Sequence, residues 1–257
     1  MPRLASKIAF VTGSGQGVGQ GIAYALAGEG ATIAVVGRTM SKLEATVTEI
    51  RRRGGKAVAV ECDIKQADAL AQAVESVVAQ LGGIDILVNN AQEVPLAPLL
   101  SLSEAALAAG WESGPLATLR LMKLCHPHLK YAARNGGAGN IVNLCTVAAM
   151  RWDVSGYGGY AAVKEATRQL TRAAACEWAA DGIRTNAILP LGDSPAMAGW
   201  TRARPQEAAA FISTVPMQRV GECEADIGRF VATLVSDDCR YINGQSIAVD
   251  GGQAFLG

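Results

Sequence analysis

Short apolar runs alternate with longer segments of helical periodicity along most of the chain. The runs are rich in Val and Ile and lack polar alternation, which is typical of strands buried on both faces. Strands are therefore predicted at residues 8–11, 31–36, 57–61, 84–88, 140–144, 184–188 and 247–249. Between them, apolar residues recur at helical spacing, which predicts helices at residues 19–28, 41–53, 67–81, 102–133 and 160–180.

The alternation of strands and helices determines the expected fold class. It favours an α/β fold of the Rossmann type, with a doubly wound parallel β-sheet flanked by helices. A chain of 257 residues without repeats or linkers fits one domain, residues 1–257. Residues 191–217 are the exception, because they contain several prolines and no clear period. We expect an irregular lid over a substrate site there.

Composition and charge exclude several classes of protein. Half of the residues are hydrophobic, which excludes intrinsic disorder. The 23 basic residues balance 23 acidic ones, so no basic excess is available to bind nucleic acid. The six cysteines form no CxxC pair and have no histidine cluster beside them, so no metal site is expected. Without a signal-like start or an apolar run of about 18 residues, we expect a cytoplasmic protein and no membrane span.

A glycine-rich stretch follows the first predicted strand and leads directly into the first predicted helix. Its glycines allow a tight turn and a close approach of the backbone to a pyrophosphate. The helix N-terminus adds unpaired N–H groups that attract anions. A glycine-rich turn without a ligand is the alternative, but the position of the stretch favours a dinucleotide. The residues expected to bind it are Gly13, Ser14, Gln16, Gly17, Val18 and Gly19.

The residues after the second predicted strand bear on which dinucleotide binds. An NAD site needs a carboxylate there for the ribose 2′-hydroxyl, but the sequence has Gly37, Arg38 and Thr39. Arg38 can pair with a 2′-phosphate through two parallel hydrogen bonds. The pattern favours NADP(H) over NAD(H), with Arg38 and Thr39 as binding residues. A solvated surface arginine is the alternative.

Two side chains suited to proton transfer stand four residues apart at the start of the helix predicted at residues 160–180. Tyr160 and Lys164 therefore share one face of that helix. A neighbouring ammonium favours a phenolate, so Lys164 is expected to lower the pKa of Tyr160. Such a pair can donate or take a proton near neutral pH.

Further motifs accompany these features, and with them the sequence resembles the short-chain dehydrogenase/reductase family over nearly its whole length. Each motif alone is weak evidence, but the set is specific. The residues that carry the resemblance are Thr12-Gly13-x3-Gly17-x-Gly19, Asp63-Ile64, Asn89-Asn90-Ala91, Ile141-Val142-Asn143-Leu144, Tyr160-x3-Lys164, Arg184-x-Asn186-x3-Pro190 and Asp250-Gly251-Gly252.

The resemblance implies a hydride transfer between a nicotinamide dinucleotide and a carbonyl or alcohol. It implies that Tyr160 is the acid/base and that Lys164 binds the nicotinamide ribose. The other implied cofactor contacts are Asp63 and Ile64 at the adenine, Asn90 and Ala91 at the ribose, and Pro190 beside the nicotinamide. We therefore expect an NADP(H)-dependent oxidoreductase that interconverts a ketone and a secondary alcohol.

The sequence departs from the family pattern near the expected catalytic residues. Thr146 stands where the family carries a serine, and it keeps a hydroxyl that can polarise a carbonyl. Gln92 replaces a glycine, and Gly114 replaces a helical asparagine. Because the next residue, Pro115, cannot donate a helical hydrogen bond, we expect a bend there. We hypothesise that a water on a backbone carbonyl of this bend completes a proton relay to Lys164.

The resemblance also places two segments at the substrate. The loop before Tyr160 contributes Trp152 and Tyr157, and the lid contributes Trp200, which favours a bulky, mainly apolar carbonyl or alcohol. The apolar faces of the two longest predicted helices indicate a homo-oligomer, which the family resemblance suggests is a tetramer. Two other functions remain open: a catalytically silent dinucleotide-binding sensor or scaffold, and a methyltransferase that uses S-adenosylmethionine.

Overall fold

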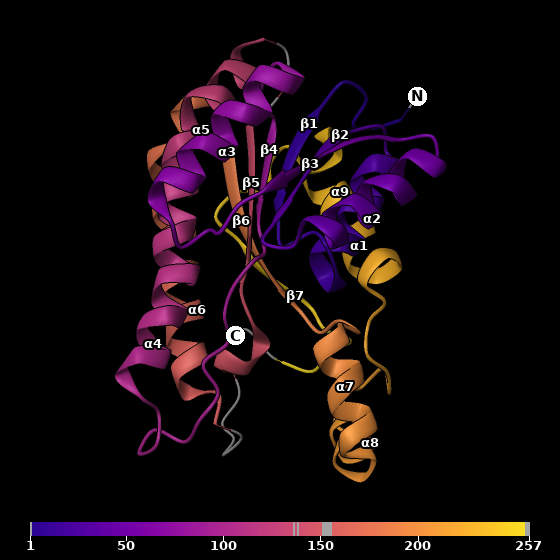
Figure 1. Cartoon of the computed structure of the whole chain (residues 1–257), viewed down its shortest axis with the longest axis vertical. Helices are drawn as coiled ribbons and strands as arrows, with labels where there is room; N and C mark the ends of the chain where they lie inside the picture. The colour runs from indigo at the N-terminus through magenta and orange to yellow at the C-terminus, as the bar shows by residue number, and fades with distance from the viewer. Residues whose placement is uncertain (1, 136, 138, 151–155, 255–257) are drawn as a thin grey trace.

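A parallel β-sheet forms the centre of the molecule. The computed structural model describes residues 2–135, 137, 139–150 and 156–254. In this part of the chain, seven strands pair in parallel in the order β3-β2-β1-β4-β5-β6-β7. They are β1 (Ile8–Thr12), β2 (Thr32–Gly37), β3 (Lys56–Glu61), β4 (Ile86–Asn89), β5 (Gly139–Leu144), β6 (Ile183–Pro190) and β7 (Ser246–Val249). The predicted doubly wound sheet is confirmed (Figure 1).

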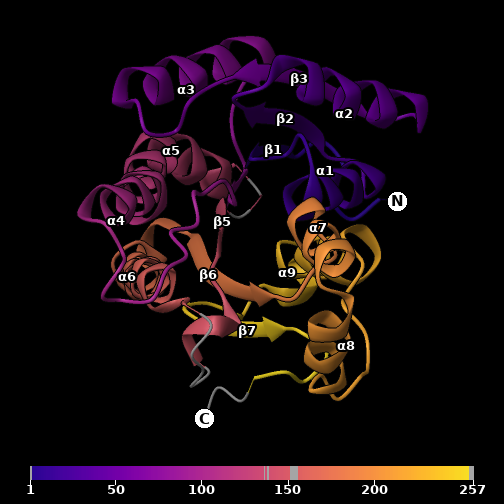
Figure 2. The ribbon, with the colours of Figure 1, turned by 60° about the horizontal axis from the view of Figure 1, so that its bottom comes forward.

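Helices cover both faces of the sheet (Figures 1 and 2). One face carries α1 (Gly17–Gly28), α2 (Met40–Arg52) and α9 (Arg229–Leu234), and the other carries α3 (Ala67–Leu81), α5 (Ala117–Arg134) and α6 (Gly158–Glu177). Because the sheet is covered on both sides, β4 and β5 are buried along their whole length, which explains why both sequences are mainly apolar. Among the described residues, no helix combines the length and the apolar character needed to cross a membrane.

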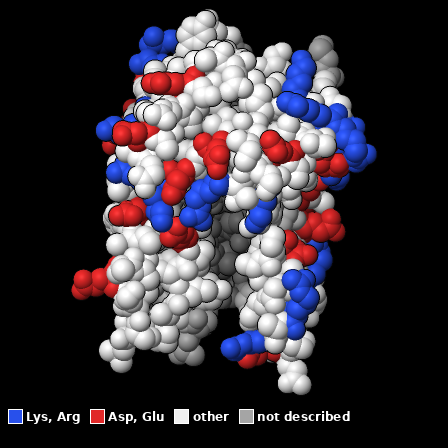
Figure 3. Space-filling view, viewed as in Figure 1, with Lys and Arg blue, Asp and Glu red and all other residues white. Residues whose placement is uncertain are grey.

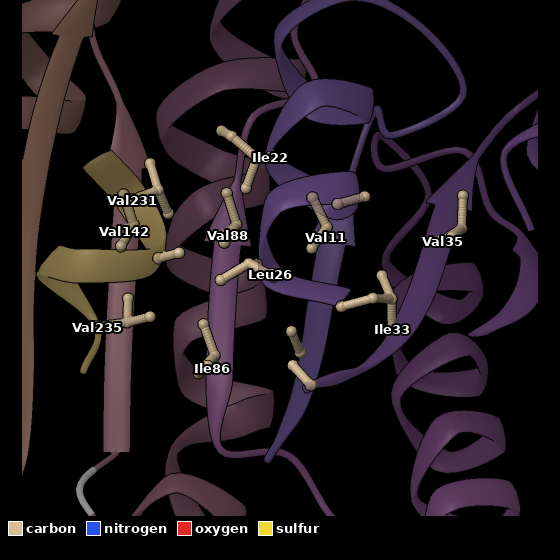
Figure 4. Packing of buried hydrophobic residues seen from close by; sticks show 14 of the residues in the cluster. Val11, Ile22, Leu26, Ile33, Val35, Ile86, Val88, Val142, Val231 and Val235 are labelled. Carbon is tan, nitrogen blue, oxygen red and sulfur yellow. The ribbon is translucent and has the colours of Figure 1, made fainter. Parts of the chain in front are cut away.

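The packing of α1 on the sheet shows how helical spacing builds the core. Ile22 and Leu26 are one helical turn apart and lie against the β-sheet beside Val11 and Val88 (Figure 4). All four side chains are completely buried. Burial of a side chain of this size contributes about 1.5–3 kcal/mol relative to exposure. These contacts fix α1, and with it the turn that precedes α1, relative to β1 and β4.

The structure corrects the prediction of an irregular lid. Residues 191–217 contain two helices, α7 (Pro195–Ala203) and α8 (Pro205–Ser213). Each begins with a proline, which suits the first helical turn because its missing N–H would be unpaired there. The Ser194 hydroxyl caps α7 by accepting a hydrogen bond from the Met197 N–H at 3.2 Å. The prolines therefore mark the starts of helices and not breaks.

A π-helical turn, Cys223–Gly228, precedes α9, and neither element was predicted. The turn packs directly on the backbone of α1 at Gly21. A Cβ at Gly21 would lie 2.6 Å from the Glu224 nitrogen, so this approach requires a glycine. The contact is made by backbone atoms, which explains why no apolar period in the sequence indicates it.

The long helix predicted at residues 102–133 is divided at its Gly-Pro pair. α4 (Glu104–Trp111) continues into α5 through a π-helical turn, Glu112–Leu116. Gly114 has φ −97° and ψ −108°, which lies outside the helical region, and Pro115 follows it within the turn. The predicted bend is confirmed.

Candidate active site

A cavity lies at the point of the sheet where the order of the strands reverses, between β1 and β4. β1 lies between β2 and β4, so the connections that follow β1 and β4 lead to opposite faces. The cavity, of about 410 Å³, lies at the carboxyl ends of these strands. The predicted cofactor residues that line it are Gly13, Gln16, Gly17, Val18, Arg38, Thr39, Asp63, Ile64, Asn90 and Ala91. Pro190, another predicted cofactor residue, ends β6 on the same edge of the sheet.

A hollow divides one end of the molecule in the space-filling view. It lies between the arm that carries α4 and α6 and the arm that carries α7 and α8 (Figure 3). Ser194, Pro195 and Ala196 at the start of α7 belong to the wall of the cavity. The second arm therefore borders the cavity as well as the hollow.

The turn between β1 and α1 is held in one conformation by buried hydrogen bonds. Gly13 and Gly17 have φ values of +65° and +60°, where residues with side chains are strained. The Ser14 hydroxyl donates to the Val11 carbonyl at 2.7 Å and accepts from the Val36 N–H at 3.0 Å. Ser14 is completely buried, so its side chain supports the turn from behind.

Asn90 and Thr12 tie the end of β4 to this turn. The Asn90 side-chain amide donates to the Thr12 and Gly13 carbonyls at 2.9 and 3.2 Å. The Thr12 hydroxyl accepts from the Asn90 and Ala91 N–H groups at 2.9 and 3.1 Å. A Cβ at Gly19 would lie 2.6 Å from the Gly13 carbonyl oxygen and would also meet the Asn90 amide. Thr12, which was not among the predicted site residues, therefore helps to shape the site.

One end of the cavity is lined by basic side chains and by Glu93. Arg38 Nη1 and Lys65 Nζ lie 3.1 and 2.9 Å from the same oxygen, Glu93 Oε1. Lys42 Nζ donates to the Gln16 side-chain carbonyl at 2.6 Å. The Lys65 ammonium donates to the Glu93 carboxylate, and this hydrogen bond raises the pKa of Lys65. Only Arg38 and Gln16 were predicted here. The position of Lys65, directly after the Asp63-Ile64 motif, is a signal that could have identified it.

Tyr160 and Thr146 meet where α6 begins and β5 ends. Thr146 follows β5, and its hydrogen bond with Tyr160 favours the phenolate. Burial acts in the opposite direction and is the larger effect, because it removes water that would stabilise the charged form. The pKa of Tyr160 is therefore raised above its usual value.

Lys164 is almost completely buried one helical turn beyond Tyr160. Its Nζ donates to the Leu144 carbonyl at 2.5 Å and lies 5.7 Å from the centroid of the Tyr160 ring. Burial lowers the pKa of Lys164 to about 8 because the ammonium loses its hydration. The prediction that the pKa of Tyr160 lies below its usual value is wrong, since burial is the larger effect at the phenol and the Lys164 ammonium donates to the Leu144 carbonyl.

Two departures from the family pattern are neighbours in space. A Cβ at Gly114 would lie 2.9 Å from Gln92 Nε2 and 2.6 Å from Val163 Cγ1. The side chains of Gln92 and Val163 thus occupy the space that a side chain at position 114 would need. Gln92 also lines the cavity, while its Nε2 is buried without a hydrogen-bond partner among the described residues. The sequence shows both substitutions, but only the structure shows that the Gln92 side chain fills space left free by the glycine at position 114.

Two of the residues predicted to contact substrate belong to the elements that form the two arms, and the third lies outside the described residues. Tyr157 packs edge-on against Tyr160, with 6.1 Å between ring centroids. Trp200 of α7 packs in the same way on Phe211 of α8, with 5.6 Å between centroids. Trp152 lies outside the described residues. Within the part of the chain that is described, no group of three or more His, Cys, Asp or Glu side chains could hold a metal.

Comparison with known sequences gives matches over nearly the whole chain. The sequence model of the family described as Enoyl-(Acyl carrier protein) reductase matches residues 13–254. The chain is 35% identical over 254 residues to 12alpha-hydroxysteroid dehydrogenase from Clostridium sp., covering 96% of each chain. It is 32% identical to a 3-oxoacyl-[acyl-carrier-protein] reductase from Staphylococcus aureus, covering 96% of this chain and 98% of the relative.

Solved structures of similar proteins share the fold. A short chain dehydrogenase from Burkholderia cenocepacia in complex with NADP superposes with a TM-score of 0.88 at 31% identity, covering 98% of this chain and 99% of that one. A 7 alpha-hydroxysteroid dehydrogenase complexed with NADH and 7-oxo glycochenodeoxycholic acid gives a TM-score of 0.90 at 28% identity, covering 99% and 97%. Both extend over the sheet, the cavity and the two arms.

Proposed function

The chain belongs to the short-chain dehydrogenase/reductase family of NAD(P)-dependent oxidoreductases, and we propose that it interconverts a ketone and a secondary alcohol with NADP(H). The observation that carries the proposal is the meeting of Tyr160, Thr146 and Lys164 at the end of β5, on the same edge of the sheet as the cavity. A scaffold that only binds a dinucleotide has no need for this group of side chains.

The cavity fits a dinucleotide. The left-handed backbone at Gly13 and Gly17 leaves the turn open to a close approach by a pyrophosphate, and α1 begins at the cavity wall. Arg38 and Lys65 offer positive charge to a 2′-phosphate, and Lys42 adds a third basic group nearby. These residues support NADP(H) over NAD(H). When bound, the nicotinamide supplies or accepts the hydride.

The residues of the chain itself account for the proton transfer. The Thr146 hydroxyl donates to the substrate carbonyl oxygen and so stabilises the negative charge that develops there. Tyr160 donates its proton to that oxygen in the direction of reduction and takes it back in the direction of oxidation. The raised pKa keeps Tyr160 protonated, as ketone reduction requires. The Lys164 ammonium, 5.7 Å from the centroid of the Tyr160 ring, stabilises the phenolate that remains.

Calorimetric titration tests the cofactor. We expect the wild type to bind NADPH more tightly than NADH, and S-adenosylmethionine not to bind. Arg38→Ala should weaken NADPH about tenfold or more, the value of a charged hydrogen bond, while NADH changes little. An equal loss for both dinucleotides would show that Arg38 does not contact the 2′-phosphate.

A panel of ketones and secondary alcohols tests the reaction. The two arms carry aromatic side chains at Tyr157, Trp200 and Phe211, which support a bulky, mainly apolar substrate. The match to a hydroxysteroid dehydrogenase agrees with such a substrate. Turnover is followed by the absorbance of the reduced nicotinamide. Tight binding of NADPH without turnover of any compound would instead favour a catalytically silent sensor, which the exchange at Gln92 and Gly114 keeps open.

We also infer that the chain forms a homotetramer. Large apolar side chains remain exposed on α4 and α5: Leu107 is 37% exposed, Trp111 48% and Tyr131 69%. Apolar surface of this kind is commonly covered by another subunit. Light scattering should give four times the chain mass, and a monomeric mass at micromolar concentration would contradict the inference.

A further inference from the structure

Glu93 places a carboxylate where the cofactor preference is decided. Its Oε1 lies 3.1 Å from Arg38 Nη1 and 2.9 Å from Lys65 Nζ, and all three residues line the cavity. The three come from different connections, because Arg38 follows β2, Lys65 follows β3 and Glu93 follows β4. The two cations that support NADP(H) binding are thus both paired with one acidic group.

The position of Glu93 is set by the backbone. The Glu93 N–H donates to the Ser113 hydroxyl at 3.0 Å, and that hydroxyl donates to the Ala109 carbonyl at 2.7 Å. Ser113 is buried in the π-helical turn between α4 and α5. The carboxylate therefore extends from a fixed point of the chain and is only one-third exposed, whereas the Arg38 side chain is 59% exposed.

The charges of this cluster act differently on the two dinucleotides. A phosphate monoester at the 2′ position carries between one and two negative charges at neutral pH and competes with Glu93 for Arg38 and Lys65. A 2′-hydroxyl instead needs an acceptor, and a carboxylate is the group that NAD sites use. The sequence has no carboxylate after β2, but the structure brings one to Arg38 from the end of β4.

We propose that Glu93 sets the dinucleotide selectivity of this chain. It lowers the affinity for NADP(H) by competing for Arg38 and Lys65, and it accepts a hydrogen bond from the ribose 2′-hydroxyl of NAD(H). This inference rests on the proposed function, because it assumes that the cavity binds a dinucleotide. The Glu93 carboxylate reduces the preference for NADP(H) over NAD(H) that Arg38 alone would impose. We therefore expect the protein to use both cofactors.

Calorimetry with NADPH and NADH on the whole chain tests the proposal by binding alone. Glu93→Gln keeps the size of the side chain and its packing but removes the charge. We expect this change to tighten NADPH about threefold to tenfold and to weaken NADH by a similar factor, as partly exposed ion pairs of this kind do. The ratio of the two affinities should therefore change about tenfold or more.

Two further variants make the result specific. Glu93→Asp keeps the charge on a shorter side chain and should retain most of the wild-type affinity for NADH. Glu29→Gln is the matched control, since Glu29 pairs with Arg3 at 2.7 Å and belongs to neither the cavity wall nor its charged cluster. It removes the same charge and an arginine pair, so the affinity ratio should stay at the wild-type value.

The outcomes separate this inference from the proposed function. If the wild type binds a dinucleotide but Glu93→Gln leaves the NADPH to NADH ratio unchanged, or changes both affinities in parallel, the role of Glu93 is overturned and the proposed function stands. If the wild type binds neither dinucleotide, the proposed function itself fails, and the selectivity role fails with it. Titration with 2′-AMP should repeat the tightening seen with NADPH, which locates the effect at the 2′-phosphate.

Discussion

The turn between β1 and α1 and the helix pair α7–α8 border the same cavity, but different forces hold them. Buried hydrogen bonds of Ser14 and Asn90 fix the turn from two sides. In contrast, α7 has no buried residue along its described length, and Ala208 is the only one in α8. The turn is part of the core, whereas the helix pair lies on the surface and is held by few contacts (Figure 2).

This difference in packing indicates that the two regions have different roles in the site. A segment with few buried contacts opens at a small cost in free energy, whereas a turn in the core opens only when the domain unfolds. We infer that the dinucleotide side of the cavity is preformed and that the α7–α8 side adapts to the substrate. Changes in the first region should affect stability and cofactor binding. Changes in the second region, apart from residues 194–196 on the cavity wall, should affect substrate binding alone.

Removal of the Tyr160 hydroxyl should give the largest effect on turnover. It tests proton transfer without changing the turn between β1 and α1 or the helix pair α7–α8. Tyr160→Phe keeps the ring, its packing on Tyr157 and the helix start, but it cannot transfer a proton. We expect single-turnover reduction to slow by roughly a hundredfold to ten-thousandfold. The Kd for NADPH and the unfolding midpoint should stay within experimental error. A variant that retains most of its turnover would show that another group supplies the proton.

The buried side chain of Lys164 makes the stability of the core depend on pH. Burial lowers its pKa from 10.5 to about 8, so below pH 8 the folded state carries the cost of a buried charge. Between these values the unfolded state binds more protons, and stability must rise with pH. The free energy of unfolding of the wild type, relative to Lys164→Met, should increase by about 3 kcal/mol from neutral pH to pH 10.5.

Denaturant titrations of both proteins across this range give the measurement. The comparison with Lys164→Met is necessary because the buried cysteines and Tyr160 also titrate at alkaline pH, with pKa values raised by burial. The contribution of Cys62 is common to the two proteins and cancels in the difference, whereas Cys145 is coupled to Lys164, because the ammonium lowers the pKa of that thiol. A constant difference would mean that Lys164 keeps its ordinary pKa in the folded chain.

A matched pair of glycine substitutions compares the two regions directly. Gly19→Ala places a Cβ 2.6 Å from the Gly13 carbonyl and against the Asn90 amide, so the turn must shift. We expect a loss of about 2 kcal/mol in stability together with weaker NADPH binding. Gly199→Ala adds the same methyl group to α7, where no described atom beyond the neighbouring backbone of the helix lies within 4 Å of it. It should stabilise the chain by up to about 1 kcal/mol through helix propensity.

Thermal unfolding and calorimetry on both variants distinguish the outcomes. Equal and small effects would mean that the turn adapts as easily as the surface helix, which would remove the basis for a preformed cofactor side. A loss of NADPH affinity in Gly199→Ala would extend the cofactor site along α7 beyond Ser194, Pro195 and Ala196, which line the cavity.

The comparison of the turn with the helix pair also explains which elements could be predicted from the sequence and which could not. The turn could be predicted because Gly13 and Gly17 satisfy a backbone requirement that leaves few alternatives. The strands could be predicted because burial on both faces demands unbroken apolar runs. The α7–α8 helices were missed because Pro195 and Pro205 act as helix starts, and that role depends on where each helix begins.

Contacts between distant segments were the other source of error. Glu93 meets Arg38 only because the sheet order brings the ends of β4 and β2 to one cavity, and no local pattern indicates such a pair. The direction of the Tyr160 pKa was also wrong, because the helical spacing to Lys164 was known but the extent of burial was not. Local backbone requirements can be predicted from the sequence. The extent of burial and the pairing of distant residues depend on how the elements pack.

The smallest expected effect concerns the surface side of the comparison. Trp200 packs edge-on against Phe211 and joins α7 to α8, with 5.6 Å between ring centroids. Trp200→Ala removes this contact, whose geometry contributes about 0.5–1.5 kcal/mol beyond the burial of the rings.

Because the pair opens locally, the global unfolding midpoint and the Kd for NADPH should barely change. Hydrogen exchange should become faster at the amides of residues 195–213, and the KM for a bulky ketone should rise several-fold while kcat is retained. Tyr241→Ala, which removes a fully exposed aromatic ring, is the control and should leave all five quantities unchanged. If Trp200→Ala instead lowers the global midpoint and the affinity for NADPH together, the helix pair is part of the same cooperative unit as the turn, and the division between a preformed and an adaptable side does not hold.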